Sequence, residues 1–276
     1  MQSPIYLMCP PDRFSVEYVI NPWMDGHIGD VDRARAHGQW EALRAILEGP
    51  LRAMIATTDP IEGLPDMVFT ANAGLVHDGK FVPARFRYEE RRGEEKHFES
   101  WFRFSGFDKV AIEGFNEGAG DLLFGTDSES RTVLYAARGF RTDSRAHESL
   151  RKAIFVPVES LDLVDPRFYH LDTCFCPLPG GALVWYPPAF AAESVNKIQA
   201  AYSQGNRFEV SADDATRFAC NAVAVPGHVV LNDCSVTLGD WLGQRGFQVH
   251  RTPLDEFMKS GGAAKCLTLR IDTGPI

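Results

Sequence analysis

Apolar runs that resemble short strands recur along the chain at nearly constant spacing, each beside a small or polar cluster. The segments are VINPWM, FTANAGLV, EGAGDLLF, HLDTCFC, CNAVAV and KCLTLRI, marked by Asn21, Asn72, Asp121, Asp172, Asn221 and Cys266. Successive markers lie 51, 49, 51, 49 and 45 positions apart. A period of this length is typical of repeated supersecondary units that pack side by side, as in a solenoid or a propeller.

The segments between the markers predict the content of one unit. Turn dipeptides, Asp78-Gly79 and Gly180-Gly181, follow two of the markers and predict hairpins. Helical patterns follow at residues 30–48, with Asp30 as a candidate N-cap, and at 93–104, 187–202 and 235–247. Strand, hairpin, helix and strand, repeated five times, predict a single domain over residues 1–276 that forms a fivefold pseudosymmetric α/β propeller. The alternative is an ordinary α/β sheet with coincidental spacing.

The stretch MVFTANAGLV, residues 67–76, predicts a strand with an interruption at its middle. Met67 to Phe69 and Leu75 to Val76 are strand-forming residues, whereas the residues between them are small or polar. Gly74 marks a bend or a close approach of other atoms to the backbone. Asn72 lies within this interruption and is a candidate for a functional side chain.

Composition and charge exclude several classes of partner. The chain has 45% hydrophobic residues, as expected for a globular protein, and its net charge is −9. This charge argues against nucleic acid or an anionic membrane surface as a partner and is compatible with a small cationic substrate. We expect no membrane span and no signal peptide. Six cysteines without a CxxC pair favour free thiols in the cytoplasm.

In a propeller the marker clusters meet at the axis, and their chemistry suggests catalysis. The residues expected there are Asn21, Asn72, Glu117, Asp121, His170, Asp172, Asn221 and Cys266. A cysteine beside a histidine, with an acid to orient the imidazole, is an arrangement for covalent catalysis. The additional carboxylates favour a planar guanidinium group as the substrate. The residues therefore suggest attack by Cys266 on the carbon of an amidine or guanidine.

Three of these sequence features have alternative interpretations. A lone cysteine is more often a small buried apolar residue than a nucleophile. In a strand, His170, Asp172, Cys174 and Cys176 share one face and could bind a metal, but the separated pairs typical of structural zinc sites are absent. The stretch GAGD lacks the other residues of a phosphate-binding loop. We therefore expect neither a metal nor another cofactor.

Several motifs together resemble the pentein, or amidinotransferase, superfamily. They are CPPDRFSVEYVINPWM, PDMVFTANAG, EERRGEE, EGAGD, HLD and KSGGAAKCLTL, which occur in that order and cover essentially the whole chain. The superfamily includes arginine deiminases, dimethylarginine dimethylaminohydrolases, arginine amidinotransferases and arginine dihydrolases. The resemblance implies a fivefold pseudosymmetric α/β propeller, in agreement with the spacing, and an enzyme without a cofactor.

The resemblance also implies three catalytic roles. Cys266 is the expected nucleophile, and it attacks the guanidino carbon. His170 is the expected general acid and base, which protonates the leaving nitrogen and then activates water. Glu117 is expected to pair with His170 and hold its ring in place.

Five further residues are implied in substrate binding. Asp172 is expected to bind the guanidinium nitrogens, with Asp121 as a supporting group and Asn72 beside them. Arg91 is expected to bind the substrate carboxylate, and the neighbouring alternatives are Arg85, Arg87 and Arg92. Asn21 is a further contact to the amino-acid part of the substrate.

Asn72 separates the alternatives within the superfamily. Deiminases commonly have an aspartate at this position, and the resemblance is closest to arginine and N-succinylarginine dihydrolases, which also carry asparagine. A carboxylate only accepts hydrogen bonds, whereas an amide also donates them and can hold a neutral citrulline-like intermediate for a second hydrolysis. We therefore expect an arginine dihydrolase that forms ornithine, ammonia and carbon dioxide. The alternatives are a dimethylarginine hydrolase or deiminase that forms citrulline, an amidinotransferase, a non-catalytic binder and a zinc protein. Self-association into a homo-oligomer is compatible with the sequence.

Overall fold

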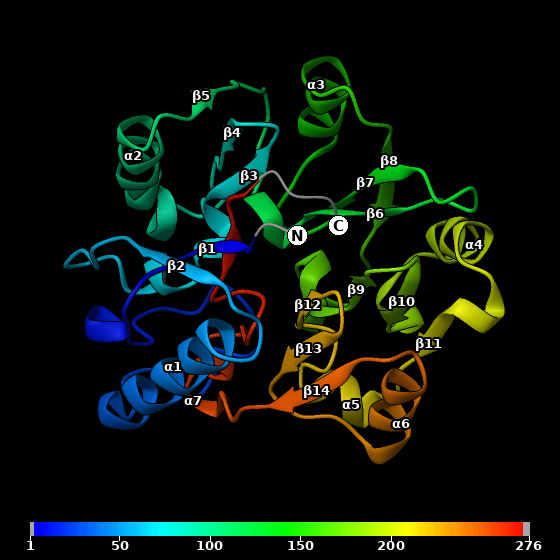
Figure 1. Cartoon of the computed structure of the whole chain (residues 1–276). Helices are drawn as coiled ribbons and strands as arrows, with labels where there is room; N and C mark the ends of the chain where they lie inside the picture. Colours follow the sequence, from blue (N-terminus) through cyan, green and yellow to red (C-terminus); the bar gives the residue numbers. More distant parts are fainter. Residues whose placement is uncertain (1–2, 273–276) are drawn as a thin grey trace.

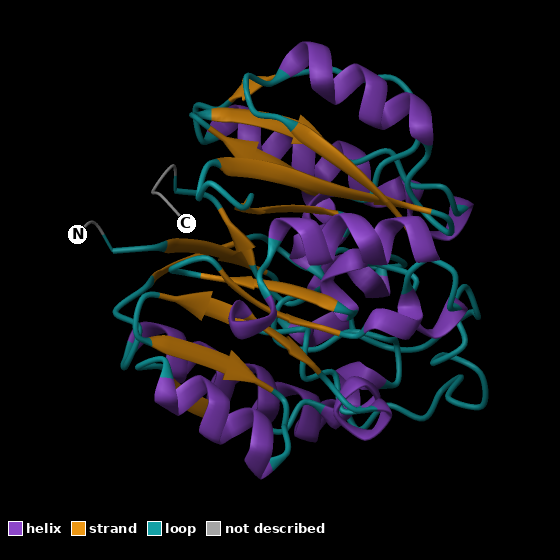
Figure 2. Ribbon diagram, turned by 90° about the vertical axis from the view of Figure 1, so that its right-hand side faces the viewer, coloured by secondary structure: helices purple, strands orange, loops and turns teal. Residues whose placement is uncertain are grey.

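The computed structural model describes residues 3–272, in which short strands form five three-stranded sheets. The sheets are arranged around a common centre, with the longer helices on the outside (Figure 1). In side view the strands lie one above another, with helices beside them and at both ends of the stack (Figure 2). The predicted fivefold pseudosymmetric α/β architecture is therefore confirmed. None of the helices described is long and apolar enough to cross a membrane.

One blade shows the plan that the others repeat. Strand β3 (Gly74–His77) pairs antiparallel with β4 (Lys80–Pro83), and β5 (Asp108–Lys109) returns parallel to β4 after helix α2 (Glu89–Phe104). Asp78 and Gly79, at φ 49° and 71°, form the hairpin turn that the sequence predicts. The second blade comprises β6 (Leu122–Thr126), β7 (Thr132–Arg138), α3 (Ser144–Ala153) and β8 (Val158–Asp162). The third comprises β9 (Phe175–Leu178), β10 (Ala182–Trp185), α4 (Ala192–Ala201) and β11 (Arg207–Glu209). The fourth comprises β12 (Val223–Val225), β13 (His228–Leu231), α6 (Val236–Gln244) and β14 (Gln248–Arg251).

The remaining blade joins the beginning and the end of the described chain. Strand β1 (Ile5–Met8) runs parallel to β2 (Met54–Thr57), to which helix α1 (Arg33–Glu48) connects it. The inner strand of this blade is β15 (Leu269–Arg270), which pairs antiparallel with β1. This pairing closes the ring. The short helices α5 (Ala212–Thr216) and α7 (Asp255–Met258) lie in the connections that precede the inner strands β12 and β15.

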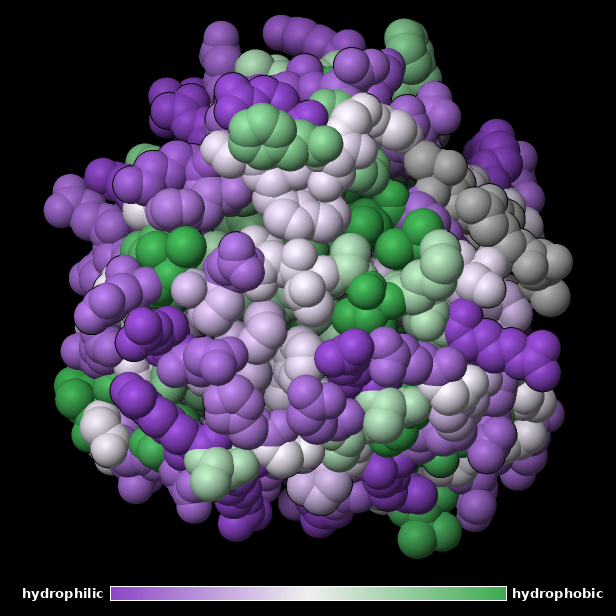
Figure 3. All heavy atoms as spheres, turned by 60° about the vertical axis from the view of Figure 1, so that its left-hand side comes forward, coloured by the Kyte–Doolittle hydropathy of each residue, from purple (hydrophilic) through white to green (hydrophobic). Residues whose placement is uncertain are grey.

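Apolar side chains fill the space between each helix and its sheet. On α2, for example, Phe102 is buried and stacks on Phe81 of β4, with ring centroids 3.7 Å apart. On the face shown in Figure 3, hydrophilic side chains predominate toward the edge, and apolar side chains occur in groups near the middle and at a few points of the edge. The four predicted helices are present, but α1 starts after Asp32, whose side chain caps it, and not after Asp30. Helix α2 starts at Glu89 and not at residue 93, and α4 starts at Ala192 and not at residue 187. Helix α3 was not predicted.

Tight turns, and not strands, carry most of the marker residues. One-turn 3-10 helices precede three inner strands: Thr70–Ala73 comes directly before β3, and Gly118–Gly120 and Leu171–Thr173 end one residue before β6 and β9. The predicted strand at residues 67–69 is wrong, since Pro65–Val68 is another 3-10 helix. Asn21 lies in a separate turn outside the fivefold repeat. In each of the five blades, the marker side chain thus lies in the turn before the inner strand, which carries it to the axis.

Two of these turns touch through glycine. Gly118 has φ 59°, and a Cβ atom on it would lie 2.6 Å from the backbone nitrogen of Gly74. A side chain at Gly118 would therefore push apart the turns that carry Asn72 and Glu117. This contact explains why small residues occur in both markers.

We expect Gly118→Ala to lower the free energy of unfolding by several kcal/mol, because it combines a left-handed backbone with a clash. Gly79→Ala is the matched control, since Gly79 has φ 71° and open space around it. The control should cost about 1 kcal/mol. Urea denaturation measures both variants, and equal losses would contradict the proposed contact.

Candidate active site

Cys266 lies at the axis, in the turn that precedes β15, and its side chain is buried. The Cys266 thiol Sγ lies 3.3 Å from Oδ2 of Asp172 and accepts a hydrogen bond from Nδ2 of Asn221 at 3.1 Å. Burial raises the pKa of the Cys266 thiol well above its ordinary value, and the Asp172 carboxylate raises it further. The thiol is therefore protonated at neutral pH until another charge approaches it.

Asn221 fixes the position of the thiol from both ends of its amide. Its Oδ1 accepts hydrogen bonds from the backbone nitrogens of Ala263 and Cys266, at 3.1 Å each, and its Nδ2 also donates to the carbonyl of Asp172. The sequence pattern marked Asn221 as a residue at the axis but gave it no role. Its position before β12 is the signal that identifies it.

Asp172 is the carboxylate that faces the sulfur. One oxygen contacts the thiol, whereas Oδ1 is buried and has no hydrogen-bond partner among the described residues. Burial raises the pKa of Asp172 to about 6, and the positive charge of Lys265 opposes this shift. A buried carboxylate oxygen without a donor is unfavourable on its own and becomes satisfied when an N–H group of a ligand binds.

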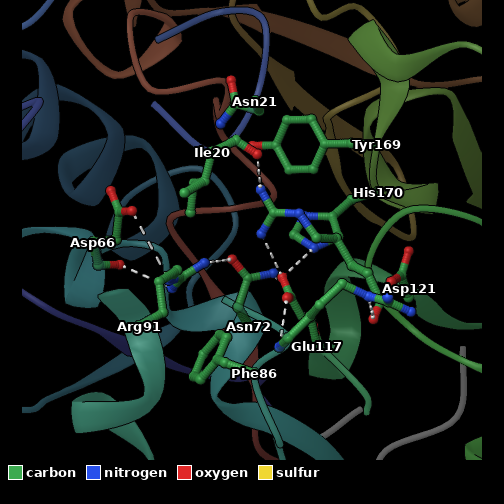
Figure 4. A network of polar contacts seen from close by, with 12 residues as sticks. Ile20, Asn21, Asp66, Asn72, Phe86, Arg91, Glu117, Asp121, Tyr169 and His170 are labelled. Carbon is green, nitrogen blue, oxygen red and sulfur yellow. Dashed lines mark hydrogen bonds and ion pairs between the residues drawn. The ribbon is translucent and has the colours of Figure 1, made fainter. Parts of the chain in front are cut away.

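Glu117 and His170 form the second part of the site. His170 Nε2 lies 2.8 Å from Oε2 of Glu117, and the same oxygen accepts a hydrogen bond from Nη1 of Arg141 at 2.8 Å (Figure 4). Burial alone would raise the pKa of Glu117, but Arg141 and His170 outweigh it and hold the pKa well below its ordinary value. Glu117 is thus a fixed negative charge that orients the imidazole.

Asp121 supports this arrangement from behind. Its carboxylate accepts hydrogen bonds from the hydroxyl of Thr142 and from the backbone nitrogen of Leu171, at 2.7 and 3.1 Å. Leu171 lies between His170 and Asp172, so this second bond fixes the turn that carries both. Burial raises the pKa of Asp121 to about 6.

Asn72 connects the Arg91 guanidinium with the backbone of Glu117. Its Oδ1 accepts a hydrogen bond from Nη1 of Arg91 at 2.8 Å, and its Nδ2 donates to the carbonyl of Glu117 at 3.3 Å (Figure 4). Both ends of the amide are used. An aspartate could replace the first bond but would place a carboxylate oxygen against a carbonyl oxygen in the second.

Arg91 is buried on α2 and is paired mainly with an acid of its own helix. Its Nε and Nη2 donate to the two oxygens of Glu94 at 2.8 Å, and Nη2 also donates to the carbonyl of Asp66. The guanidinium lies 4.4 Å above the ring of Phe86. Of its five N–H donors, these bonds and the one to Asn72 use four.

Three further residues beside these side chains were not predicted from the sequence. Arg141 lies between the rings of Tyr88 and Tyr169, and donates to Glu117 and to the carbonyl of Ile20. Asp66 accepts hydrogen bonds from the hydroxyls of Tyr18 and Ser260. Tyr169 donates to the carbonyl of Gly261. Asp66 lies in the motif PDMVFTANAG but was given no role, and neither Arg141 nor Tyr169 has a marker position or a motif.

One enclosed cavity lies among these residues. It is lined by Cys266, Asn72, Arg91, Arg141, Asp66, Asn21, Ile20 and Tyr169. Its free volume is about 10 Å³, hardly enough for one water molecule. Asn21 itself closes the turn at residues 21–24, since its Oδ1 accepts from the nitrogens of Trp23 and Met24 and its Nδ2 donates to Ser260. A ligand larger than a water molecule can therefore enter only if some of the lining residues move.

The metal interpretation of HLDTCFC rests on a wrong geometry. His170 precedes the 3-10 turn Leu171–Thr173, Asp172 lies within it, and the strand begins only at Phe175, so these side chains do not share a strand face with Cys174 and Cys176. Within residues 3–272 no cluster of three or more histidine, cysteine, aspartate or glutamate side chains could hold a metal ion.

Comparison with known proteins gives similarities that cover nearly the whole of this chain. The bifunctional arginine dihydrolase/ornithine cyclodeaminase ArgZ of Synechocystis sp. is 48% identical over 272 residues, which are 98% of this chain but 38% of ArgZ. N(G),N(G)-dimethylarginine dimethylaminohydrolase of Mycobacterium tuberculosis is 41% identical over 96% of this chain and 85% of that protein. The crystal structure of the N-terminal domain of ArgZ, a cysteine-to-serine variant bound to substrate, superposes with a TM-score of 0.93 at 47% identity, covering 97% of this chain and 98% of that domain. No protein-family model matches the chain.

The fold, the axial thiol and these similarities define a member of the pentein superfamily, the class that includes guanidino-modifying hydrolases and transferases. Within this class, the chain belongs to the family of the arginine dihydrolase domain of ArgZ and the mycobacterial dimethylarginine dimethylaminohydrolase. It spans less than two fifths of the length of ArgZ.

We expect Asn221→Asp to raise the pKa of the Cys266 thiol, because a carboxylate would replace the amide that donates to the sulfur. The pH at which alkylation of Cys266 by iodoacetamide reaches half its maximal rate should rise by on the order of one unit. Peptide mapping distinguishes Cys266 from the other buried thiols. Asn206→Asp, at an exposed position, is the control and should leave the profile unchanged; a downward shift in Asn221→Asp would contradict the assignment.

Proposed function

We propose that the protein is an arginine dihydrolase, which converts arginine and two water molecules into ornithine, two ammonia molecules and carbon dioxide. The observation that carries this proposal is Oδ1 of Asp172, a buried carboxylate oxygen without a donor, beside the Cys266 thiol. The N-terminal domain of ArgZ, with nearly the same fold, supports the choice of substrate.

The guanidinium end of arginine fits against Asp172. An N–H group of the substrate supplies the missing donor to Oδ1, and its positive charge favours ionisation of both the carboxyl and the nearby thiol. The elevated pKa of the thiol would therefore fall when the substrate is bound. Activation of Cys266 by its own substrate also protects the free enzyme from unwanted thiol reactions.

We assign the first hydrolysis to Cys266 as nucleophile and His170 as general acid and base. The thiolate sulfur attacks the guanidino carbon, and His170 transfers a proton to the nitrogen that leaves as ammonia. His170 then takes a proton from water, whose oxygen attacks the carbon of the covalent thiouronium. The carbon–sulfur bond breaks, and the thiolate and a neutral citrulline-like group result. Glu117 holds the imidazole during both proton transfers.

The second hydrolysis repeats these steps on the neutral group. Cys266 attacks the ureido carbon, the second ammonia leaves, and water releases a carbamate that loses carbon dioxide to give ornithine. For this the neutral intermediate must stay bound, and an amide serves better than a carboxylate because it donates as well as accepts. We assign this role to Asn72, whose orientation Arg91 fixes.

The amino-acid end fits the opposite side of the cavity. Arg141 donates two of its five N–H groups to protein acceptors and Arg91 donates four, so both retain a donor for a substrate carboxylate and Arg141 retains more. Asp66 is the acid available for the α-amino group. Asn21 contributes by closing the turn above this end.

Several further parts of the proposal rest on the sequence. The enzyme works in the cytoplasm, requires no cofactor, and its substrate is a small cationic guanidino amino acid. The single domain comprises residues 1–276. The relative from M. tuberculosis makes dimethylarginine the second candidate substrate.

Incubation of the purified protein with arginine should yield ornithine and about two equivalents of ammonia, measured by chromatography and an ammonia assay. Cys266→Ser should lower the rate by at least about 10³-fold, since it removes the nucleophile. Cys234→Ser, remote from the cavity, is the control. Stoichiometric citrulline without ornithine would defeat the dihydrolase proposal, and turnover of dimethylarginine alone would favour the second candidate.

Asn72→Asp should shift the products from ornithine toward citrulline, because the neutral intermediate would lose its donor and leave early. The rate of arginine consumption should fall less than the rate of ornithine formation. Direct assay with citrulline as substrate isolates the second step. A product ratio equal to that of the unmodified protein would remove Asn72 from the explanation.

A further inference from the structure

A second and much larger cavity lies on the axis, on the strand side of the turns that carry the catalytic residues. Its volume is about 270 Å³, and the inner strands of all five blades contribute to its wall. It shares no lining residue with the catalytic cavity. The volume is just below that of pockets for drug-sized ligands, and is sufficient for a small metabolite.

The wall of this axial cavity is mainly apolar. Leu75, Leu123, Phe124, Phe175 and Val223 contribute aliphatic and aromatic side chains. At the end formed by β15 and the residues after it, Arg270 and Asp272 form a bidentate ion pair, so they add little net charge. Such a wall suits the apolar body of a ligand.

Lys265 brings a single positive charge into the cavity. Its ammonium group donates to the carbonyl of Ala119 at 3.5 Å, at the limit of a hydrogen bond, and forms no ion pair with any carboxylate among residues 3–272. An ammonium has three donors, so most of its capacity is unused. An anionic oxygen in the cavity would satisfy it.

We propose that the axial cavity binds a small monocarboxylate with an apolar body, whose carboxylate pairs with Lys265. The apolar wall receives the hydrocarbon part, and the one ammonium without a counter-ion receives the charge. This is a second ligand site, separate from the site for the guanidino substrate.

Ligand binding at this site reaches the catalytic centre through Lys265. Lys265 precedes Cys266 in the chain, and its charge lowers the pKa of both Asp172 and the Cys266 thiol against the effect of burial. A carboxylate on Lys265 would cancel this effect, and both pKa values would rise. For the activity this consequence rests on the proposed function: a bound monocarboxylate should shift the acid limb of the kcat/KM profile for arginine to higher pH.

Binding is tested on the full chain without turnover, by isothermal titration with hexanoate and with hexanamide as its neutral analogue. Lys265→Met keeps the length of the side chain and should weaken hexanoate binding about 10–100-fold, because hydrogen bonds to charged groups are the stronger ones. Lys96→Met, at an exposed position, is the control and should bind hexanoate as the unmodified protein does.

Ala224→Phe tests the location, since it narrows the axial cavity and leaves Lys265 and the catalytic cavity intact. It should abolish hexanoate binding while the melting temperature stays close to that of the unmodified protein. Absence of hexanoate binding to the folded protein, equal binding of hexanamide, or undiminished binding in both cavity variants would overturn the proposal. Because titration needs no turnover, these outcomes are independent of whether arginine is the substrate.

Discussion

The site depends on the buried interaction of the Glu117 carboxylate with Arg141 and His170. The carboxylate joins three separate parts of the chain, because Arg141 and His170 both bond to its Oε2 and Arg141 also holds the carbonyl of Ile20. Removal of one partner from such a buried pair leaves an uncompensated charge and typically costs 3–5 kcal/mol. The ion pair therefore sets the orientation of the imidazole and links it to the segment that covers the cavity.

Much of the fold was predictable because its repeat appears in the sequence as regularly spaced polar clusters beside apolar runs. The spacing of Asn72, Asp121, Asp172, Asn221 and Cys266 corresponds to the turns before the inner strands of the five blades. The Asp78-Gly79 hairpin followed from the left-handed conformations that such a turn requires. These features are local, so a sequence pattern can reveal them.

The errors arose where tertiary contacts override local preference. Met67 and Phe69 are strand formers, yet the chain around them turns tightly to carry Asn72 to the axis. Arg141 lies in a connection between β7 and α3 whose sequence carries no motif, and only the folded ring brings it to Glu117. Helix α3 is largely polar, so its apolar face was too narrow to detect.

The pairing of β15 with β1 makes the order of biosynthesis significant. A ribosome releases Asn72, Glu117 and His170 well before Cys266, and domains generally begin to fold from the N-terminal side during translation. The nascent chain can therefore assemble the acids and the imidazole while it still lacks the sulfur. Strand β15 closes the ring on β1 and directly follows the turn that supplies the nucleophile, so the site gains its sulfur only as the fold is completed.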